Sequence, residues 1–439
     1  MLTQKEMLEL LHADVVPAIG CTEPACVALA VADAAKTAEL APHEIDTVEV
    51  EVSPSIYKNG MSVAIPGYPE LGLDKAAAIG AVVARPECGL EIFGELNDER
   101  AHEVRAFLAK KRVVVRLADG ERGVFVHARV TGSAKTAAKT TEATCTIQGA
   151  HTRVVERTRN HTVLELAHSP ATAAGSGLEQ KLFDMKISDI VQLVRETPAQ
   201  ELAFLMQGVT MNQQASDFGV THTVGVGISH ALTSSQEKVL LGDNLMARIT
   251  QKVASATEAR LGGGVIPCMS SSGAGTKGLA VILPTVELAH EMGSSTEELT
   301  RALAIGHLVN RYINLHVGKL AAICTCVMAS STGASAAMAY LLGANAEQIG
   351  YAIRNMCGTV TGMICDGGKV GCALKVSIGS LAALNCAYLA AQNVTLSVTD
   401  GILATTPEAC IDNVGRIANP GMLATDKEIL AIMREKSES

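Results

Sequence analysis

Tryptophan is absent from this chain, and aromatic residues of all kinds make up only 3% of its 439 residues. Hydrophobic residues nevertheless make up 48% of the chain. The core must therefore be built from alanine, valine, leucine, isoleucine and glycine, whose small side chains allow helices to approach one another closely. A chain of this length can bury a large core and is expected to form two or three domains.

The sequence also lacks an excess of positive charge. Its formal net charge is -9 and its pI is about 5.8, which argues against nucleic acid or an anionic membrane as a partner. Residues 320–346 contain no charged side chain and could cross a bilayer by length, but the middle of this run, Ala329 to Ser335, is small and polar. We therefore expect a central helix that is buried in protein and does not span a membrane.

Three common catalytic fingerprints are missing as well. The chain has no His-Glu-x-x-His, Gly-x-Ser-x-Gly or Gly-x-Gly-x-x-Gly sequence in a suitable setting, which argues against a zinc protease, a serine hydrolase and a dinucleotide-binding enzyme. Residues 1–12 form a charged amphipathic pattern without a hydrophobic signal region, so a cytoplasmic location is expected. In a reducing cytoplasm, the twelve cysteines indicate metal binding or catalysis more than disulfide bonds.

Cys21 lies in an Ile-Gly-Cys-Thr-Glu-Pro segment that has the features of a helix start. Thr22 suits the N-cap, and Glu23 and Pro24 suit the first turn, so we expect a helix over residues 23–40. The unpaired backbone N–H groups and the positive end of the helix dipole would favour a thiolate, which would make Cys21 a base or a nucleophile. The alternative is that Cys21 is a small buried core residue.

Cys365 and Cys372 are seven positions apart in a glycine-rich loop. Such a loop can fold back so that both sulfurs face one metal centre, and its N–H groups can donate to the sulfides of a cluster. The spacing is not Cys-x-x-Cys, so zinc-ribbon and rubredoxin-like sites are poor alternatives. A third ligand would come from Cys324 or Cys326. Only one of the two is expected to face the metal centre, because residues two apart on a helix point in different directions. Ordinary core cysteines are the other interpretation.

Two polar loops are candidates for binding an anionic substrate group. The first loop, residues 261–278, is rich in glycine and serine and precedes an apolar run. Its backbone N–H groups and the hydroxyls of Ser270 and Ser272 would form a carboxylate cradle at a helix entry. Lys58, in the loop of residues 53–60, could pair with a carboxylate. The alternatives are a helix–helix turn rich in small residues for the first loop and a simple hairpin turn for the second.

The hydrophobic pattern predicts two kinds of structure along the chain. Period-two alternation with β-branched residues predicts strands, and amphipathic stretches between them predict helices. The strands are expected at residues 47–53, 112–116, 123–130 and 161–166, and the helices at residues 74–83 and 97–110. After a loop at residues 169–177, the pattern is helical with glycine punctuation.

The predicted fold is an α+β N-terminal region followed by a mostly α-helical C-terminal catalytic domain that carries the cysteine site. We expect the α+β domain over residues 45–180 and an all-α cluster-binding domain over residues 181–439. The N-terminal helices of residues 1–44 are expected to pack on the helical domain, because Cys21 must reach the cysteine cluster.

Five separated motifs in the same order resemble those of the L-cysteine desulfidases, a family related to the alpha portion of bacterial iron-sulfur L-serine dehydratases. They are Gly20-Cys-Thr-Glu-Pro24, Ser53-Pro54 with Lys58-Asn59-Gly60, Met269-Ser270 with Ser272-Gly273, Lys319-Leu-x-x-x-Cys324, and Gly362-Met-Ile-Cys-Asp-Gly367 with Cys372. The resemblance implies a [4Fe-4S] enzyme without pyridoxal phosphate that converts L-cysteine to pyruvate, ammonia and sulfide.

The resemblance also implies roles for single residues. Cys21 matches the acid/base thiol, and Cys324, Cys365 and Cys372 match the cluster ligands, whereas Cys326 has no clear counterpart and is the fallback ligand. The candidate substrate-binding residues lie in the same motifs and are Lys58, Asn59, Ser270, Ser272 and Gly273.

This reading gives a concrete expected reaction with two alternatives. Three thiolate ligands would leave one iron of a cubane open as a Lewis acid, and Cys21 would take the α proton of a small amino acid. Serine dehydratases carry a cysteine in a C-terminal tail that reaches back to the open iron, whereas the last cysteine here is Cys410. We therefore expect β-elimination of L-cysteine, with L-serine dehydration as the alternative. A non-catalytic iron-sulfur sensor or binding protein is a further alternative, and the sequence is compatible with a homo-oligomer.

Overall fold

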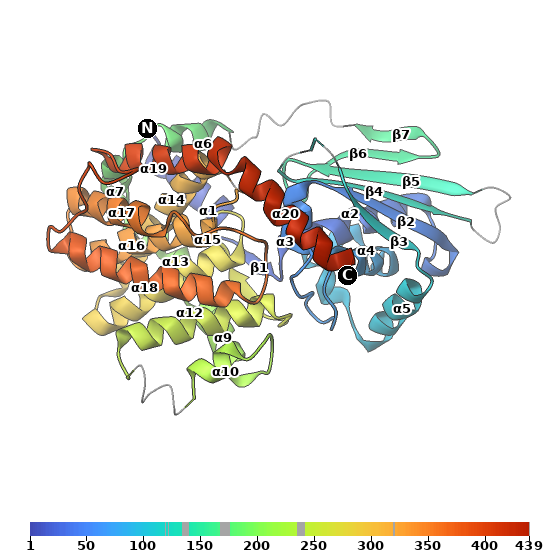
Figure 1. The fold of residues 1–439 in the computed structure, drawn as a ribbon, viewed down its shortest axis with the longest axis horizontal. Coiled ribbons are helices and arrows are strands. Elements are labelled where there is room, and N and C mark those ends of the chain that lie inside the picture. The colour runs from blue at the N-terminus through green and yellow to red at the C-terminus, as the bar shows by residue number, and fades with distance from the viewer. Residues whose placement is uncertain are drawn as a thin grey trace.

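The computed structural model describes residues 1–118, 120–121, 123–133, 140–166, 176–234, 242–318 and 321–438. Figure 1 shows two lobes side by side, one built around a sheet and one made of helices, with the C-terminal helix α20 (Leu423–Glu438) crossing their junction. The loop predicted at residues 169–177 lies almost entirely outside the described residues.

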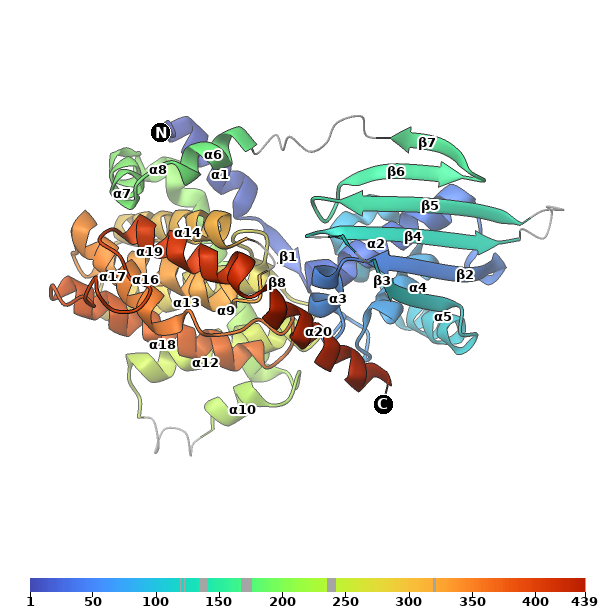
Figure 2. The same ribbon diagram turned by 45° about the horizontal axis from the view of Figure 1, so that its top comes forward.

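The first lobe contains a six-stranded mixed sheet with the strand order β3-β2-β4-β5-β6-β7, whose strands are seen side by side in Figure 2. β2 and β3 are parallel, and the other neighbouring pairs are antiparallel. The valines of β2 are buried and its glutamates are not, as expected for a strand with one covered face. The strands are β2 (Ile45–Val52), β3 (Val113–Leu117), β4 (Phe125–Gly132), β5 (Thr141–Gln148), β6 (Val154–Arg159) and β7 (Thr162–Leu166).

Helices cover the apolar face of this sheet. α2 (Thr22–Ala38) and α4 (Leu73–Val83) pack against each other and against the strands, and α5 (Asp98–Ala109) packs on α4. Their buried side chains form one apolar core with the inner face of the sheet. The shorter elements of this lobe are η1 (Pro42–Glu44), α3 (Pro54–Gly60) and η2 (Pro86–Glu95).

The second lobe is almost entirely helical and has its own apolar core. The α+β and helical parts confirm the predicted fold class. Its elements are α1 (Gln4–Asp14), α6 (Ser176–Phe183), α7 (Ile187–Glu196), α8 (Ala199–Leu202), η3 (Ala203–Leu205), α9 (Met206–Thr221), α10 (Ile228–Leu232), α12 (Leu245–Leu261), β8 (Pro267–Met269), α13 (Gly275–Met292), α14 (Thr296–Val317), α15 (Thr325–Met328), α16 (Ser330–Leu341), α17 (Ala346–Val360), α18 (Cys372–Ala391), α19 (Pro407–Arg416) and η4 (Ile417–Gly421).

α16 lies at the centre of the helical lobe, where it contacts α13, α14, α17 and α18. Residues 330–339 are buried, so the prediction of a central helix in this uncharged run is confirmed. Gly333 lies directly against α14, since a Cβ placed on it would be 2.4 Å from the carbonyl oxygen of Gly306. The backbones of the two helices therefore touch, which is the close approach that a core poor in aromatic residues allows.

The prediction that residues 1–44 pack on the helical lobe is wrong for α2. α1 contacts α14 and α6, but α2 is buried against α4 and the sheet. The cause is composition, because α2 is rich in alanine and buried on nearly all sides, and a helix of this kind fits between two layers. β1 (Pro17–Ile19) pairs with β8 of the helical lobe, and this pairing leads the chain from one lobe into α2 of the other.

α18 is the one described helix that is long and apolar enough to cross a bilayer. Length and composition alone do not distinguish a membrane-spanning helix from a core helix of a soluble protein. Within the helix, 44% of the apolar stretch is buried against the rest of the protein. A single helix of this kind is weak evidence for a membrane span.

Replacing Gly333 by alanine should destabilise the helical lobe. The new methyl group would meet the Gly306 carbonyl oxygen at 2.4 Å, and overpacking of this kind costs about 1–3 kcal/mol. The obstacle is a backbone atom that cannot easily move, so we expect a cost near the upper end of that range. This cost exceeds the ~1 kcal/mol that alanine gains over glycine in a helix, and the net effect is a loss of stability. The control is Gly94→Ala, since a Cβ at Gly94 meets nothing within 4 Å. Equal midpoints of thermal unfolding for the two variants would contradict the backbone contact.

Candidate active site

Cys21 is the N-cap residue of α2 and is 9% exposed. Thr22 is already the first helical residue, so the prediction that it is the N-cap is wrong by one position. Gly20 has φ +66°, and a Cβ there would be 2.5 Å from the ring of Pro66, so the turn that enters α2 requires glycine. The Cys21 Sγ donates a hydrogen bond to Oε2 of Glu23 over 2.8 Å.

The surroundings of Cys21 favour its thiol form. Burial raises the pKa of Cys21 well above its ordinary value and the Glu23 carboxylate raises it further, while the charge of Arg260 opposes them. Burial would also raise the pKa of Glu23, but the charge of His151 and the hydrogen bond from Cys21 hold that pKa below its usual value. The expectation of a resting thiolate is therefore wrong here, because desolvation and a nearby anion outweigh the helix dipole. The pair consists of a thiol donor and a carboxylate acceptor.

Cys324 and Cys365 lie on two short segments that run side by side. The Cys324 N–H donates to the carbonyl oxygen of Met363 over 2.8 Å, and the Cys365 N–H donates to the carbonyl oxygen of Ala322 over 2.6 Å. An isolated antiparallel bridge joins the same segments. Backbone bonds therefore fix the two cysteines next to each other. Lys319 and Leu320, which begin the matching motif, lie outside the described residues.

Cys372 is the first residue of α18 and completes a set of three neighbouring thiols, called here the three-thiol set. Burial, followed by the negative charges that Cys365 and Cys372 would carry, raises the pKa of Cys324 to about 12. Cys326 lies nearby, and burial together with Cys324 raises its pKa while the charge of Lys277 opposes the change. The three predicted ligands thus lie near enough to affect one another's charge, and the fallback ligand does so as well, while their role as ligands stays a prediction.

The glycine loop that precedes Cys372 contacts α3 and Cys21. Gly367 has φ +95°, and a Cβ on it would be 2.2 Å from the carbonyl oxygen of Lys58. A Cβ on Gly368 would be 3.6 Å from the Cys21 Sγ. Cys372 packs against the small buried cluster to which Cys21 belongs. Glycine is therefore needed where the helical lobe meets α3 and the start of α2.

Each of these sulfurs except that of Cys365 lies at the start of a helix. Cys21 is the N-cap of α2, Cys324 is the N-cap of α15, and Cys372 is the first residue of α18. Unpaired N–H groups and the positive end of each helix dipole favour negative charge at such positions. The arrangement would stabilise thiolate ligands or a substrate carboxylate.

The three-thiol set fits an iron-sulfur cluster by its chemistry. Thiolates are the usual ligands of these clusters, and a glycine-rich loop can donate backbone N–H groups to their sulfides. Within the part of the chain that the structure describes, no three His, Cys, Asp or Glu side chains are close enough together to hold a metal ion. The sulfurs of Cys324, Cys365 and Cys372 would therefore have to come closer together on binding a cluster.

Lys58 and Asn59 lie on α3 beside this centre. The Asn59 Nδ2 donates to Oε1 of Glu23 over 3.3 Å, so it holds the carboxylate that pairs with Cys21. Lys58 is 1% exposed, and its ammonium forms an ion pair with Asp426 of α20. The alternative of an exposed lysine in a hairpin turn is therefore wrong. Direct contact of either residue with a substrate stays a prediction.

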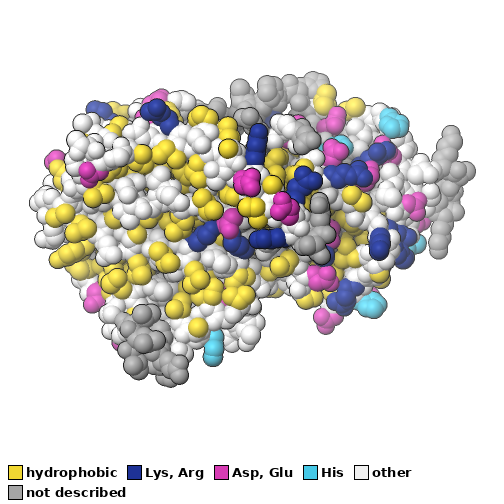
Figure 3. Space-filling view, viewed as in Figure 1, with side chains coloured by type: hydrophobic (Ala, Val, Ile, Leu, Met, Phe, Trp, Pro, Cys, Tyr) yellow, Lys and Arg dark blue, Asp and Glu magenta, His cyan; other side chains and the backbone are white. Residues whose placement is uncertain are grey.

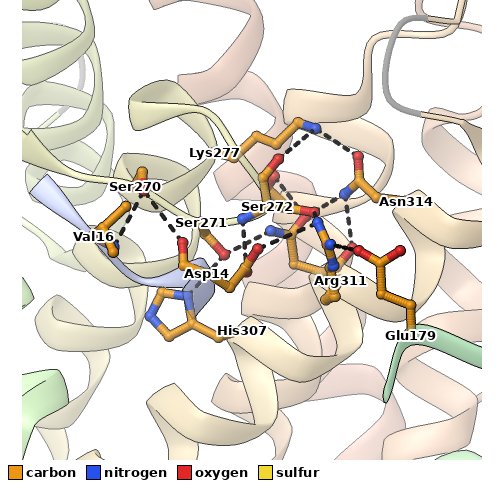
Figure 4. A network of polar contacts seen from close by, with 12 residues as sticks. Asp14, Val16, Glu179, Ser270, Ser271, Ser272, Lys277, His307, Arg311 and Asn314 are labelled. Atoms are coloured by element: carbon orange, nitrogen blue, oxygen red, sulfur yellow. Dashed lines mark hydrogen bonds and ion pairs between the residues drawn. The ribbon is translucent and has the colours of Figure 1, made fainter. Parts of the chain in front are cut away.

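The serine-rich loop binds a carboxylate that belongs to the protein itself (Figure 4). The Ser272 N–H donates to Oδ2 of Asp14 over 2.7 Å, and the Ser270 hydroxyl donates to the Asp14 carbonyl oxygen over 3.3 Å. Arg311 pairs with the same carboxylate at 3.3 Å. These contacts anchor the end of α1 to the entry of α13. Substrate binding by Ser270, Ser272 and Gly273 stays a prediction that these contacts do not support.

Two residues of the centre were missed by the sequence reasoning. Glu23 was assigned only to the helix start, although its position two residues after the thiol could have suggested a partner. Arg260 is 2% exposed and donates to the carbonyl oxygen of Gly20 over 2.5 Å and to Oγ1 of Thr276 over 2.9 Å. It ties the entry of α2 to the first turn of α13, and no spacing in the sequence pointed to it.

The chain is similar over almost its whole length to proteins of several organisms. A UPF0597 protein of Clostridioides difficile (strain 630) is 37% identical over 435 residues, which cover 98% of this chain and 100% of the relative. A UPF0597 protein of Alkaliphilus metalliredigens is 35% identical over 437 residues, which cover 97% of this chain and 94% of the relative. A UPF0597 protein of Caldanaerobacter subterraneus is 36% identical over 430 residues, which cover 98% of each chain. The family described as serine dehydratase alpha chain matches residues 96–431. The chain therefore belongs to the serine dehydratase alpha chain family, which confirms the predicted relation to the alpha portion of the iron-sulfur serine dehydratases.

Proposed function

We propose that this protein is an iron-sulfur lyase that eliminates the β substituent of L-cysteine and yields pyruvate, ammonia and sulfide without pyridoxal phosphate. Membership of the serine dehydratase alpha chain family supports a lyase. The observation that carries the proposal is the 2.8 Å hydrogen bond from Cys21 to Glu23. Cys21 belongs to a small group of buried apolar residues, and Cys372 packs against the same group. A proton-accepting pair thus adjoins the three-thiol set.

The chain's own residues supply the proton transfers that such an elimination needs. The sulfur of Cys21 accepts the α proton of the substrate while the Glu23 carboxylate takes the proton that Cys21 already carries, so that no free thiolate has to form first. Asn59 holds the second oxygen of Glu23 and keeps the carboxylate turned toward the thiol. A [4Fe-4S] cluster held by the three-thiol set would supply a Lewis acid for the substrate carboxylate and the leaving group. The aminoacrylate product then hydrolyses to pyruvate and ammonia.

L-Serine is the alternative substrate, because loss of water and loss of sulfide need nearly the same site. The serine dehydratases that this chain resembles carry a cysteine in a C-terminal tail. Here Cys410 is fully buried in α19, where its Sγ accepts a hydrogen bond from the Ala404 N–H over 3.2 Å. α20, which covers the junction of the lobes, contains no cysteine. We place L-cysteine first because the motifs of this chain resemble those of the L-cysteine desulfidases.

A non-catalytic iron-sulfur sensor or binding protein is the third candidate. Such a protein needs cluster ligands but no acid/base thiol. Burying a carboxylate beside a thiol is unfavourable unless the pair is fully satisfied, and the Cys21 and Glu23 pair is buried. The pair therefore supports a catalyst over a sensor.

The first expected result is turnover of L-cysteine by the anaerobically reconstituted protein. Sulfide and pyruvate should appear together, and pyruvate should form more slowly from L-serine, because hydrosulfide is a weaker base than hydroxide and therefore a better leaving group. Pyruvate and sulfide are measured separately with each amino acid. Pyruvate from L-serine alone would make the protein a dehydratase, and the absence of both products would favour the sensor.

The second expected result concerns the cluster ligands. Cys365→Ala should lose most of the iron and sulfide bound on reconstitution, together with the broad visible absorption, because one of three thiolate donors is gone. Cys88→Ala is the control, since it removes a thiol from η2 of the sheet lobe and leaves the three-thiol set intact. An unchanged iron content in Cys365→Ala would remove that residue from the ligand set.

The third expected result separates the acid/base thiol from the ligands. Cys21→Ala should keep the visible absorption and lose turnover by about 10²-fold or more, which is the usual contribution of a positioned acid or base. Cys26→Ala is the matched control, because Cys26 is a fully buried thiol on the same helix. Turnover retained in Cys21→Ala would end the assignment of Cys21 as the base.

A further inference from the structure

Lys58 is a buried cation whose partner comes from the other end of the chain. Its side chain is 2% exposed, and its ammonium pairs with the carboxylate of Asp426 on α20. Asp426 is 27% exposed, so it reaches the lysine from the surface of the protein. The charge of Lys58 is therefore neutralised by a residue that lies outside the lobe to which the lysine belongs.

Lys58 lies at the edge of the cysteine centre. The glycine loop touches its backbone at Gly367, and the next residue, Asn59, holds the carboxylate of Glu23. An anion bound to the Lys58 ammonium would therefore be held on the same short helix that positions the partner of Cys21.

α20 covers this edge of the centre. Figure 1 shows it crossing the junction of the lobes, and Figure 3 shows acidic and basic side chains gathered over that junction. A pocket of about 430 Å³ lies between α20 and the loop that bears Cys365. Its lining includes Ile429, Met433 and Lys436 from α20 and Ile364, Asp366 and Lys369 from the loop. Ile429 is the one buried residue among residues 423–436.

The buried charge restricts how α20 can move. An ammonium that stays buried without an anion is strongly unfavourable, so an anion that replaces Asp426 on Lys58 lowers the cost of moving α20 away. The α-carboxylate of an amino acid is the same chemical group as the Asp426 side chain and carries the same charge. It is therefore a matched competitor for the lysine.

We propose that Lys58 is the carboxylate-binding subsite of the cysteine centre and that Asp426 occupies it until the α-carboxylate of an amino-acid substrate displaces it. α20 then moves away, and the substrate enters through the pocket beneath it. One ion pair breaks and another forms, with no proton transferred. The proposal rests on the proposed function for the class of its ligand.

A permanent clamp between the two lobes is the competing explanation. In that case Asp426 would hold α20 in every state of the protein, and its loss would weaken the structure without improving substrate binding. A displaceable Asp426 instead competes with the substrate, so its loss should improve binding. The two explanations predict opposite changes in KM.

The kinetic test compares Asp426→Asn with Glu428→Gln in the reconstituted full-length protein. Glu428 is an exposed acidic residue two positions further along α20, so its variant removes the same charge without touching Lys58. We expect the KM for L-cysteine to fall about threefold or more in Asp426→Asn, with kcat retained, because a competing closed state is lost. A KM equal to or above that of Glu428→Gln would overturn the proposal.

A second measurement does not depend on turnover. Hydrogen exchange of the α20 amides is followed in the reconstituted wild-type protein with L-alanine, which has an α-carboxylate but no leaving group, and with L-alaninamide, which lacks the carboxylate. L-Alanine should speed exchange in α20, and L-alaninamide should not. Exchange that ignores L-alanine, or that responds equally to both compounds, would overturn the subsite. Because this signal needs no catalysis, it can succeed even when the lyase proposal fails.

Discussion

The contact of the glycine loop with α3 is the constraint on which the candidate site depends. A side chain at Gly367 would meet the carbonyl oxygen of Lys58 at 2.2 Å, and one at Gly368 would lie 3.0 Å from the carbonyl oxygen of Asn59 and in ordinary contact with Cys21. The three-thiol set belongs to the helical lobe, whereas Cys21 begins a helix of the sheet lobe. Only glycine allows the two backbones to come this close, so these two residues join the halves of the site.

Burial and helix N-termini act in opposite directions on the thiols of this site. Burial raises the pKa of the thiols at Cys21 and Cys324, which stabilises their protonated forms in these surroundings. Helix N-termini at the same sulfurs act in the other direction. Metal ligation requires thiolates and therefore releases protons. Cluster binding at such a centre would be coupled to deprotonation, and Glu23 is the carboxylate nearest to the thiol that stays outside the ligand set.

The parts of the fold that were predicted correctly are those with a simple local pattern. Strict alternation located β2 and β4, and amphipathic spacing located α4 and α5 to within about two residues. β5 was not singled out, because Ala143, Cys145 and Ile147 alternate with threonines and glutamine over a stretch with little contrast in hydrophobicity. The position of α2 was also missed, because an alanine-rich helix that is buried on nearly every side has no polar face to show which layer it joins.

The sequence by itself determined the fold class and, to within one residue, the start of the helix that follows Cys21, because local periodicity and capping depend on neighbouring residues. Only the tertiary structure decided the burial of Cys21 against Glu23, the occupation of the serine-rich loop by Asp14 and the pairing of Lys58 with Asp426. Each of these depends on burial or on partners from distant parts of the chain. Electrostatic energies follow distances in space and exposure to water, and neither quantity is written in the spacing of residues along the chain.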